Sequence, residues 1–90
     1  MNKAELIDHI ARQADISRSA AARALEAVIG GVKTTLNKGE SVAIAGLGTF
    51  VVAQREARSG RNPRTGAAVS IKAARLPKFR PAKALKDHLN

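Results

Sequence analysis

The segment from residue 53 to residue 75 most constrains the fold, because it has two strand-like runs and very little to bury. It carries six Arg and Lys side chains against one Glu, and its only large apolar residues are Val69 and Ile71. Turn-forming residues at 60–66 separate the two runs. A hairpin this long cannot fill a core of its own. The segment therefore predicts a projecting arm that grips a polyanion, with Pro63 at its tip.

The rest of the chain is small for an independent core. The 90 residues make one small domain in which 18 residues are Ala and only 22 are Leu, Ile, Val, Phe or Met. Domains of this size often depend on oligomerisation, and the absence of Cys excludes disulfides and thiolate-bound metals. We therefore expect a dimer.

The net charge of +9 is unevenly distributed along the chain. Residues 1–41 carry six basic and five acidic groups, whereas residues 42–90 carry ten basic and two acidic groups. This asymmetry is typical of a nucleic-acid-binding surface. No apolar signal-peptide core follows Met1, and no apolar run approaches the roughly 18–20 residues of a membrane span. We expect an intracellular protein with no membrane partner.

Two helices are predicted at the amino-terminal end. Asn2 can cap the first, with Glu5 three residues later, and Ser17 can cap the second, over 18–37. The second helix has an apolar stripe at helical spacing that comprises Leu25, Val28, Ile29, Val32 and Leu36. Gly30 and Gly31 inside it indicate either a weak point or, as we favour, the close approach of another helix such as a dimer partner's.

The second half predicts strands and a short last helix. A strand at 42–45 and a turn at 46–48 lead to a strand from residue 49 that continues into the arm. Residues 76–81, with two prolines, predict an irregular connector, and 82–89 a final helix. In that helix we expect Pro81 at the first turn, Ala82, Leu85 and Leu89 inward, and Lys83 and Lys86 outward.

The predicted tip combines a proline with flanking cations. Pro63 follows Asn62, and Arg58, Arg61 and Arg64 recur every three residues around them. An exposed proline ring can enter between base steps in a minor groove while arginines follow the narrow, negative groove walls. The alternative is an ordinary solvated hairpin turn.

Further cations lie on and after the predicted arm strands. Arg55, Arg58, Lys72 and Arg75 could line the inner surface of the ribbon, although strand pleating prevents every charge from pointing one way. The alternative is a charged hairpin whose edge is guarded against aggregation. The cations that follow, Lys78, Arg80, Lys83 and Lys86, predict contacts with phosphates.

Other classes of function have weaker support. The first two helices resemble a helix-turn-helix, but the apolar stripe favours a structural pair. His9 and His88 are isolated, no catalytic motif is present, and 46–48 reads as a hairpin turn rather than a phosphate loop. The only aromatic residues are Phe50 and Phe79, which argues against stacking on single-stranded RNA. We expect no enzyme, cofactor, metal or small-molecule substrate.

Several motifs together resemble the bacterial histone-like HU proteins of the HU/integration host factor family. They are Gly-Leu-Gly-Thr-Phe at 46–50, Gly-Arg-Asn-Pro at 60–63 with Thr-Gly at 65–66, Pro-Lys-Phe-Arg at 77–80 and Lys-Ala-Leu-Lys at 83–86, with a similar opening at 1–7. The resemblance covers the whole chain. It implies an α+β fold: an intertwined dimer with a helical base, a small antiparallel β-saddle and two long β-ribbon arms.

The resemblance also implies the roles of the segments. One HU-like domain, 1–90, would comprise a helical dimerisation base at 1–41, a saddle with the last helix at 42–52 and 76–90, and a DNA-binding arm at 53–75. The implied partner is duplex DNA, preferably bent, nicked or junction DNA, which the protein bends and compacts with little sequence preference in the nucleoid of the bacterial cytoplasm. Its partner subunit would be identical or a paralogue.

The resemblance and the charge pattern together give the expected site residues. The DNA-binding set is Lys3, Arg55, Arg58, Arg61, Asn62, Pro63, Arg64, Lys72, Arg75, Lys78, Arg80, Lys83 and Lys86, with Pro63 intercalating. The dimer-interface set is Leu25, Val28, Ile29, Val32, Leu36, Ile44, Leu47, Phe50 and Phe79.

Two departures and two rival functions accompany this hypothesis. Leu47 stands where the family usually has Phe, and Pro81-Ala82 replaces a small residue followed by Gly. One rival is a sequence-specific DNA bender of the integration host factor type. Those subunits commonly carry extra terminal residues, so the ends of this chain favour HU. The other rival is a basic structural protein that binds folded RNA.

Overall fold

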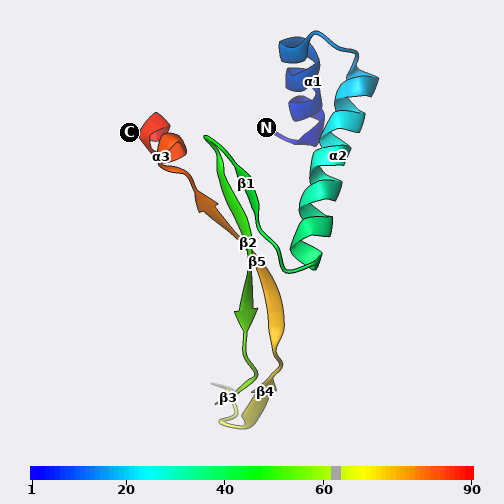
Figure 1. The fold of residues 1–90 in the computed structure, drawn as a ribbon. Helices are drawn as coiled ribbons and strands as arrows, with labels where there is room; N and C mark the ends of the chain where they lie inside the picture. Colours follow the sequence, from blue (N-terminus) through cyan, green and yellow to red (C-terminus); the bar gives the residue numbers. More distant parts are fainter. Residues whose placement is uncertain (62–63) are drawn as a thin grey trace. The chain divides into compact units, whose positions relative to one another are not determined.

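The computed structural model describes residues 1–61 and 64–90, and for residues 58, 61 and 69–71 it describes the backbone but not the side chain. The described elements are α1 (Lys3–Ala14), α2 (Arg18–Asn37), β1 (Val42–Ile44), β2 (Gly48–Arg55), β3 (Arg58–Arg61), β4 (Ala68–Ile71), β5 (Ala74–Pro81) and α3 (Lys83–Leu89) (Figure 1). The chain divides into two compact units, Met1–Thr34 and Thr35–Asn90.

The first unit contains α1 and most of α2, and both predicted helix starts are confirmed. The Asn2 side chain accepts a hydrogen bond from the backbone N–H of Glu5 at 2.9 Å, and the Ser17 hydroxyl accepts one from Ala20 at 3.0 Å. Each bond satisfies a backbone donor that a helix start leaves without an intrahelical partner. The buried apolar residues of the unit are small, Ala11 and Ala21.

Ion pairs join the two helices of this unit. The Asp8 carboxylate, on α1, lies 3.5 Å from Nε of Arg18, the first residue of α2, and 3.3 Å from the guanidinium of Arg12. Lys3 and Glu26 form a second connection. These pairs are exposed, so each contributes little by itself to stability.

The second unit is built on a three-stranded antiparallel sheet with the order β1-β2-β5. Strand β2 pairs with β5 over eight positions, from Gly48 opposite Pro81 to Arg55 opposite Ala74. The predicted irregular connector at 76–81 is therefore wrong, because these residues belong to β5. The prediction that Pro81 begins the last helix is also wrong, because Pro81 ends β5 and Ala82 is the N-cap of α3.

The prolines fit in β5 because of where they lie. Proline has no N–H, so Pro77 and Pro81 can occupy only positions whose backbone groups point away from β2. Pro77 and Pro81 are separated by an even number of residues, so their backbone groups point the same way, away from β2. Strand β5 is an edge strand, so no strand on its other side requires a backbone N–H from either proline. Phe79 has this parity too and lies opposite Phe50, with ring centroids 4.9 Å apart. Opposed side chains come close at such pairs.

Beyond this sheet the two strands of the arm continue as a separate ribbon. Strand β3 pairs with β4 from Arg58 opposite Ile71 to Arg61 opposite Ala68. Residues 56–57 and 72–73 join the ribbon to the sheet, and we call these four residues the hinge. Gly66, with φ of +72°, falls within the turn expected at 60–66, but that range is too long, because Gly60 and Arg61 belong to β3.

The apolar side chains of the described residues are incompletely buried. No large side chain among them is fully buried, and Val28 is 54 % exposed, Leu47 40 % and Phe79 40 %. Leu89, expected to face inward from α3, is 76 % exposed, so that expectation is wrong for a single chain. A core made of two alanines leaves most of the apolar surface without a partner in one chain.

Gly48 allows the close approach of β5, and this generates a first prediction. A Cβ at this position would lie 2.5 Å from the backbone oxygen of Arg80 and 2.6 Å from the ring of Phe79. Gly48→Ala should therefore destabilise the protein by about 3 kcal/mol, as overpacking of a closed site does. Urea unfolding at a fixed chain concentration measures the effect. Gln54→Ala, at an exposed position of the same strand, should change stability by less than about 0.5 kcal/mol. Equal midpoints for the two variants would contradict the assigned contact.

Candidate nucleic-acid interface

The pleat of the β2–β5 pair places three cations on one face of the sheet and both phenylalanines on the other. Lys78 lies opposite Val51, and Arg80 lies opposite Thr49, so all four side chains share one face of the sheet. Arg55, opposite Ala74, belongs to the same face. The other face carries Phe50, Val52, Pro77 and Phe79. The first face, which we call the cationic face, also carries Val51 and Leu76, and the second, which we call the apolar face, also carries Arg75.

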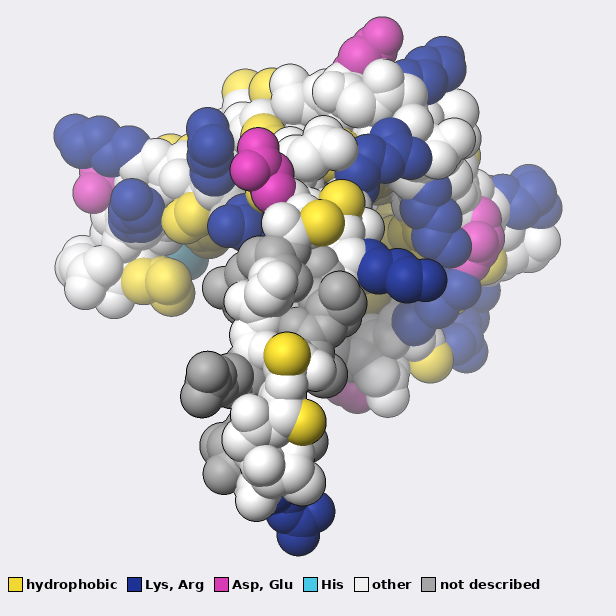
Figure 2. All heavy atoms as spheres, turned by 90° about the horizontal axis from the view of Figure 1, so that it is seen from below, with side chains coloured by type: hydrophobic (Ala, Val, Ile, Leu, Met, Phe, Trp, Pro, Cys, Tyr) yellow, Lys and Arg dark blue, Asp and Glu magenta, His cyan; other side chains and the backbone are white. Residues whose placement is uncertain are grey.

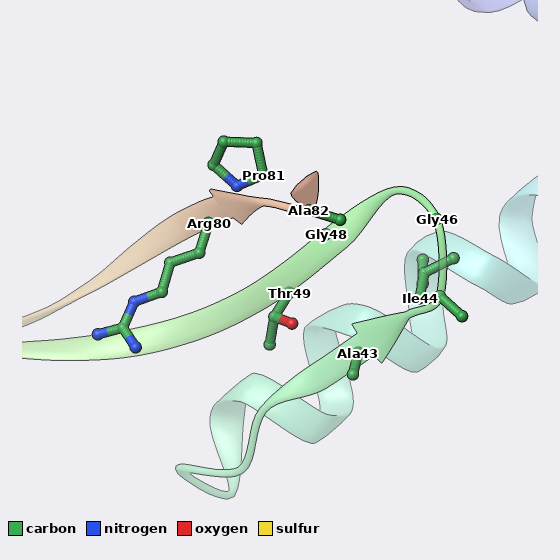
Figure 3. Close-up of a pocket in the computed structure, with 9 residues that line it drawn as sticks. Ala43, Ile44, Gly46, Gly48, Thr49, Arg80, Pro81 and Ala82 are labelled. Carbon is green, nitrogen blue, oxygen red and sulfur yellow. The ribbon is translucent and has the colours of Figure 1, made fainter. Parts of the chain in front are cut away.

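A hollow of about 470 Å³ adjoins the cationic face, between the β1–β2 turn and the end of β5 (Figure 3). Small residues such as Ala43, Gly46 and Ala82 form much of its wall. Arg80 is the one charged residue in the described lining, and Thr49 supplies a hydroxyl beside it. Arg80 and Thr49 lie opposite each other on neighbouring strands and are the lining residues that carry a guanidinium and a hydroxyl.

The predicted arm residues are only partly described. Asn62 and Pro63 lie outside the described residues, as do the side chains of Arg58 and Arg61, whose backbones form β3. Arg64 is exposed in the turn that follows. The predictions that these residues bind DNA, and that Pro63 intercalates, therefore stay predictions.

Two arm cations have defined positions at the hinge. The guanidinium of Arg55 donates a hydrogen bond to the backbone carbonyl of Lys72 at 3.0 Å, and both side chains are exposed. The Arg55 side chain therefore connects the end of β2 to the returning half of the hinge. A guanidinium has five N–H groups, so this single bond to a carbonyl does not exhaust its donors.

Arg75 lies on the face opposite to Arg55, because it pairs with Gln54. Its guanidinium donates to the backbone carbonyl of Asn37 at 2.9 Å and to the Asn37 side-chain oxygen at 3.3 Å. The expectation that Arg75 lines one surface together with Arg55 does not fit this register. Its DNA contact stays a prediction, and Asn37 is a partner that sequence patterns did not indicate.

The remaining predicted cations lie on helices. Lys83 and Lys86 are exposed on α3, and Lys83 lies 3.8 Å from the Asp87 carboxylate. In the first unit, Lys3 forms its ion pair with Glu26. The hydrogen bond and the positive charge of Lys3 lower the pKa of Glu26 below its ordinary value of about 4.5.

The nine expected dimer-interface residues share one property in a single chain, which is that none is buried. Val28, Leu47 and Phe79 are exposed, and the others are half-buried. Phe50 and Phe79 touch each other on the apolar face of the sheet. The interface itself stays a prediction.

Positive side chains predominate over negative ones on one face of the protein. On the face shown in Figure 2, dark blue Lys and Arg side chains outnumber magenta Asp and Glu side chains.

Within the described residues, no cluster of His, Asp and Glu has the arrangement of a metal site. No helix in that part of the chain is long and apolar enough to cross a membrane.

Comparison with known proteins gives matches along the whole chain. The family model described as "Bacterial DNA-binding protein" matches residues 1–90. The chain is 56 % identical to DNA-binding protein HU-beta of Escherichia coli K12 over 90 residues, which is all of both chains. It is 54 % identical over 89 residues to DNA-binding protein HU of Neisseria meningitidis serogroup B, covering 99 % of this chain and all of the relative.

Solved structures give the same result. The fold is similar to HU in the Anabaena HU–DNA cocrystal structure, with a TM-score of 0.89 and 34 % identity, covering 99 % of this chain and 97 % of that one. It is also similar to HU from Thermotoga maritima, with a TM-score of 0.70 and 30 % identity over all of both chains. The three helices and the antiparallel strands of the described residues fit the expected α+β fold.

The lowered pKa of Glu26 generates a second prediction. The folded state binds the Glu26 proton less tightly than the unfolded state, so the Lys3–Glu26 pair stabilises the protein above the ordinary pKa. That contribution is lost as pH falls through the lower folded-state pKa. Glu26→Gln should therefore lower the urea midpoint at neutral pH, and the difference from wild type should vanish in acid. In a Lys3→Ala background the same substitution should have a much smaller effect, because only the charge of Lys33 then lowers the pKa of Glu26. A pH-independent difference would contradict the assignment.

Proposed function

Because the chain belongs to the bacterial DNA-binding protein family, which includes the HU proteins, we propose that it bends duplex DNA as a dimer with little sequence preference. It is a histone-like DNA-binding protein. The two β-arms would embrace the duplex, and the sheet and helix ends would contact the flanking phosphates. The family is one of DNA-binding structural proteins, and we propose that this chain catalyses no reaction.

One observation carries the mechanism: Lys78 and Arg80 lie together on the face of the β2–β5 sheet that has no large aromatic residue. DNA offers this face a regular array of phosphates, and each neutralised phosphate releases condensed counterions. Contacts of this kind position a protein on the duplex without reading its sequence. They therefore support sequence-tolerant binding.

The bending step is assigned to the arm. Arg58, Arg61 and Arg64 would follow the minor groove, and Pro63 would enter between base pairs as an apolar wedge. Wedges of this type unstack a base step and kink the duplex, which is the established mode of HU and integration host factor. Nicked, bent and junction DNA would be preferred, because part of the deformation is already present in them.

Dimerisation is supported by the apolar surface that one chain leaves uncovered. The base, 1–41, would pair through the α2 stripe, and the saddle would pair through Leu47, Phe50 and Phe79. A second identical copy, or a paralogous subunit, would cover these side chains and also supply the second arm. Folding and association would then be coupled, as they are in obligate dimers. We place the protein on the nucleoid, in the bacterial cytoplasm.

The proposed function is tested by the salt dependence of binding to random duplex DNA. Contacts with about 6–10 phosphates should reduce affinity by about 10³–10⁵ between roughly 50 and 200 mM salt. Arg80→Gln removes two phosphate contacts from a homodimer and should reduce the slope of log K against log salt by about 1.8, whereas Lys38→Gln, outside the proposed surface, should leave it unchanged. Light scattering should give twice the 9.5 kDa chain mass. A shallow slope for wild type, or a preferred site that beats random duplex by several orders of magnitude, would overturn the proposal.

The wedge role of Pro63 is tested separately. Pro63→Ala should reduce the bend angle, measured by fluorescence energy transfer between duplex ends, more than it reduces affinity. The cationic contacts remain in this variant, so its salt slope should equal that of wild type. Unchanged bending would remove Pro63 from the mechanism while leaving the phosphate contacts intact.

A further inference from the structure

Resting on the proposed function, we infer that Arg75 is a positioning residue rather than a residue whose main task is to contact DNA. It holds the root of the arm, by which we mean the place where β2 and β5 meet the hinge. It is the second residue of β5, one position from the end of the paired sheet at Arg55 and Ala74. The hinge begins directly beyond that pair. Any force that the ribbon transmits to the sheet therefore reaches it at this end.

The register separates Arg75 from the cations assigned to phosphates. Arg75 has the parity of Pro77 and Phe79, whereas Lys78 and Arg80 have the opposite parity. Its side chain consequently leaves the sheet on the apolar face. There it reaches the end of α2, within the same compact unit.

The chemistry of the contact suits an anchor. Asn37 is the last residue of α2, and its carbonyl is one of those that a helix end leaves without an intrahelical donor. Arg75 supplies that donor, and its positive charge lies at the negative end of the helix dipole. A second N–H of the same planar guanidinium bonds the Asn37 side chain. A lysine could carry the charge but could not reproduce the two-pronged geometry.

Arg55 completes the arrangement from the other strand. Its bond to the carbonyl of Lys72 crosses the hinge, while the bonds of Arg75 hold the sheet side of the same junction. The two arginines lie on opposite faces of the sheet, so they restrain the root of the arm from both sides. Restraint at the root fixes the direction in which the ribbon leaves the sheet, and hence the bend that it imposes.

The anchor is tested first without DNA, by amide hydrogen exchange. Hydrogen-bonded and non-hydrogen-bonded pairs alternate along β2 and β5, and the two prolines must lie in non-hydrogen-bonded pairs. Arg55 and Ala74 are therefore a hydrogen-bonded pair, and Thr49 and Arg80 are another at the far end of the sheet. Arg75→Lys should speed exchange at Arg55 and Ala74 about tenfold, since bonds to charged groups are worth on the order of that factor. Asn37→Ala should speed it about threefold, because the backbone carbonyl remains. Amides at Thr49 and Arg80 should be unchanged in both, as should all amides in the adjacent control Lys38→Ala.

The role in bending is tested with end-labelled duplex DNA. Arg75→Lys keeps the charge, so the salt slope should stay that of wild type while the distribution of end-to-end distances in single-molecule fluorescence widens. Asn37→Ala should widen it in the same direction, and the double variant should be no worse than Arg75→Lys, because both remove one interaction.

A different pattern would overturn the inference. If Arg75→Lys and Asn37→Ala match wild type in exchange and bending while Arg75→Gln lowers the salt slope by about 1.8, which is about 0.9 for each copy in the dimer, Arg75 is a phosphate contact. If wild type fails to bend duplex DNA, the proposed function falls. The exchange measurements, made without DNA, would still report on the anchor, so the two failures are distinguishable.

Discussion

The antiparallel pairing of β2 with β5 determines where the charged residues of the sheet can act. A shift of one residue would move every side chain of β5 to the opposite face and would place Lys78 among the phenylalanines. Two features exclude that shift. Pro77 and Pro81 would then need N–H groups that they lack, and a side chain would replace Gly48 beneath Phe79 and Arg80. The prolines and the glycine thus fix the parity that separates the cationic face from the apolar one.

This separation gives the two faces different partners. The cationic face has no aromatic side chain to bury and suits a polyanion, whereas the apolar face holds Phe50 and Phe79. Among the described residues no large side chain is fully buried. In one chain Phe79 remains 40 % exposed, a cost that a partner subunit would remove. In the proposed function, DNA binding and dimerisation both depend on this register, because it produces the surface that we propose for each.

The parts of the fold that depend on local sequence could be predicted, and the parts that depend on distant residues could not. Asn2 and Ser17 indicated the helix starts because a cap acts within three residues. Strand β5 was missed because Pro77 and Pro81 argue against a central strand, and only the position of β5 at the sheet edge makes them acceptable.

The same distinction holds for the candidate site. The cations of 53–86 could be identified from composition and from the resemblance, but their distribution between two faces required the register of β2 with β5. The bond between Arg75 and Asn37 spans 38 positions in sequence and follows no short motif. The wedge role of Pro63 rests on the tip motif and the family alone.

The thin arm depends on its root for a physical reason. Strands β3 and β4 pair at only four positions, and a two-stranded ribbon of this length is marginal in water unless something packs on it. The large apolar residues at 53–75 are only Val69 and Ile71, so the ribbon gains little from burial. In the proposed mode of binding, part of the free energy of DNA binding would therefore go into ordering the ribbon in the groove. A junction held by Arg75 and Arg55 would reduce that cost without adding a single base contact, and would so strengthen binding to all sequences alike.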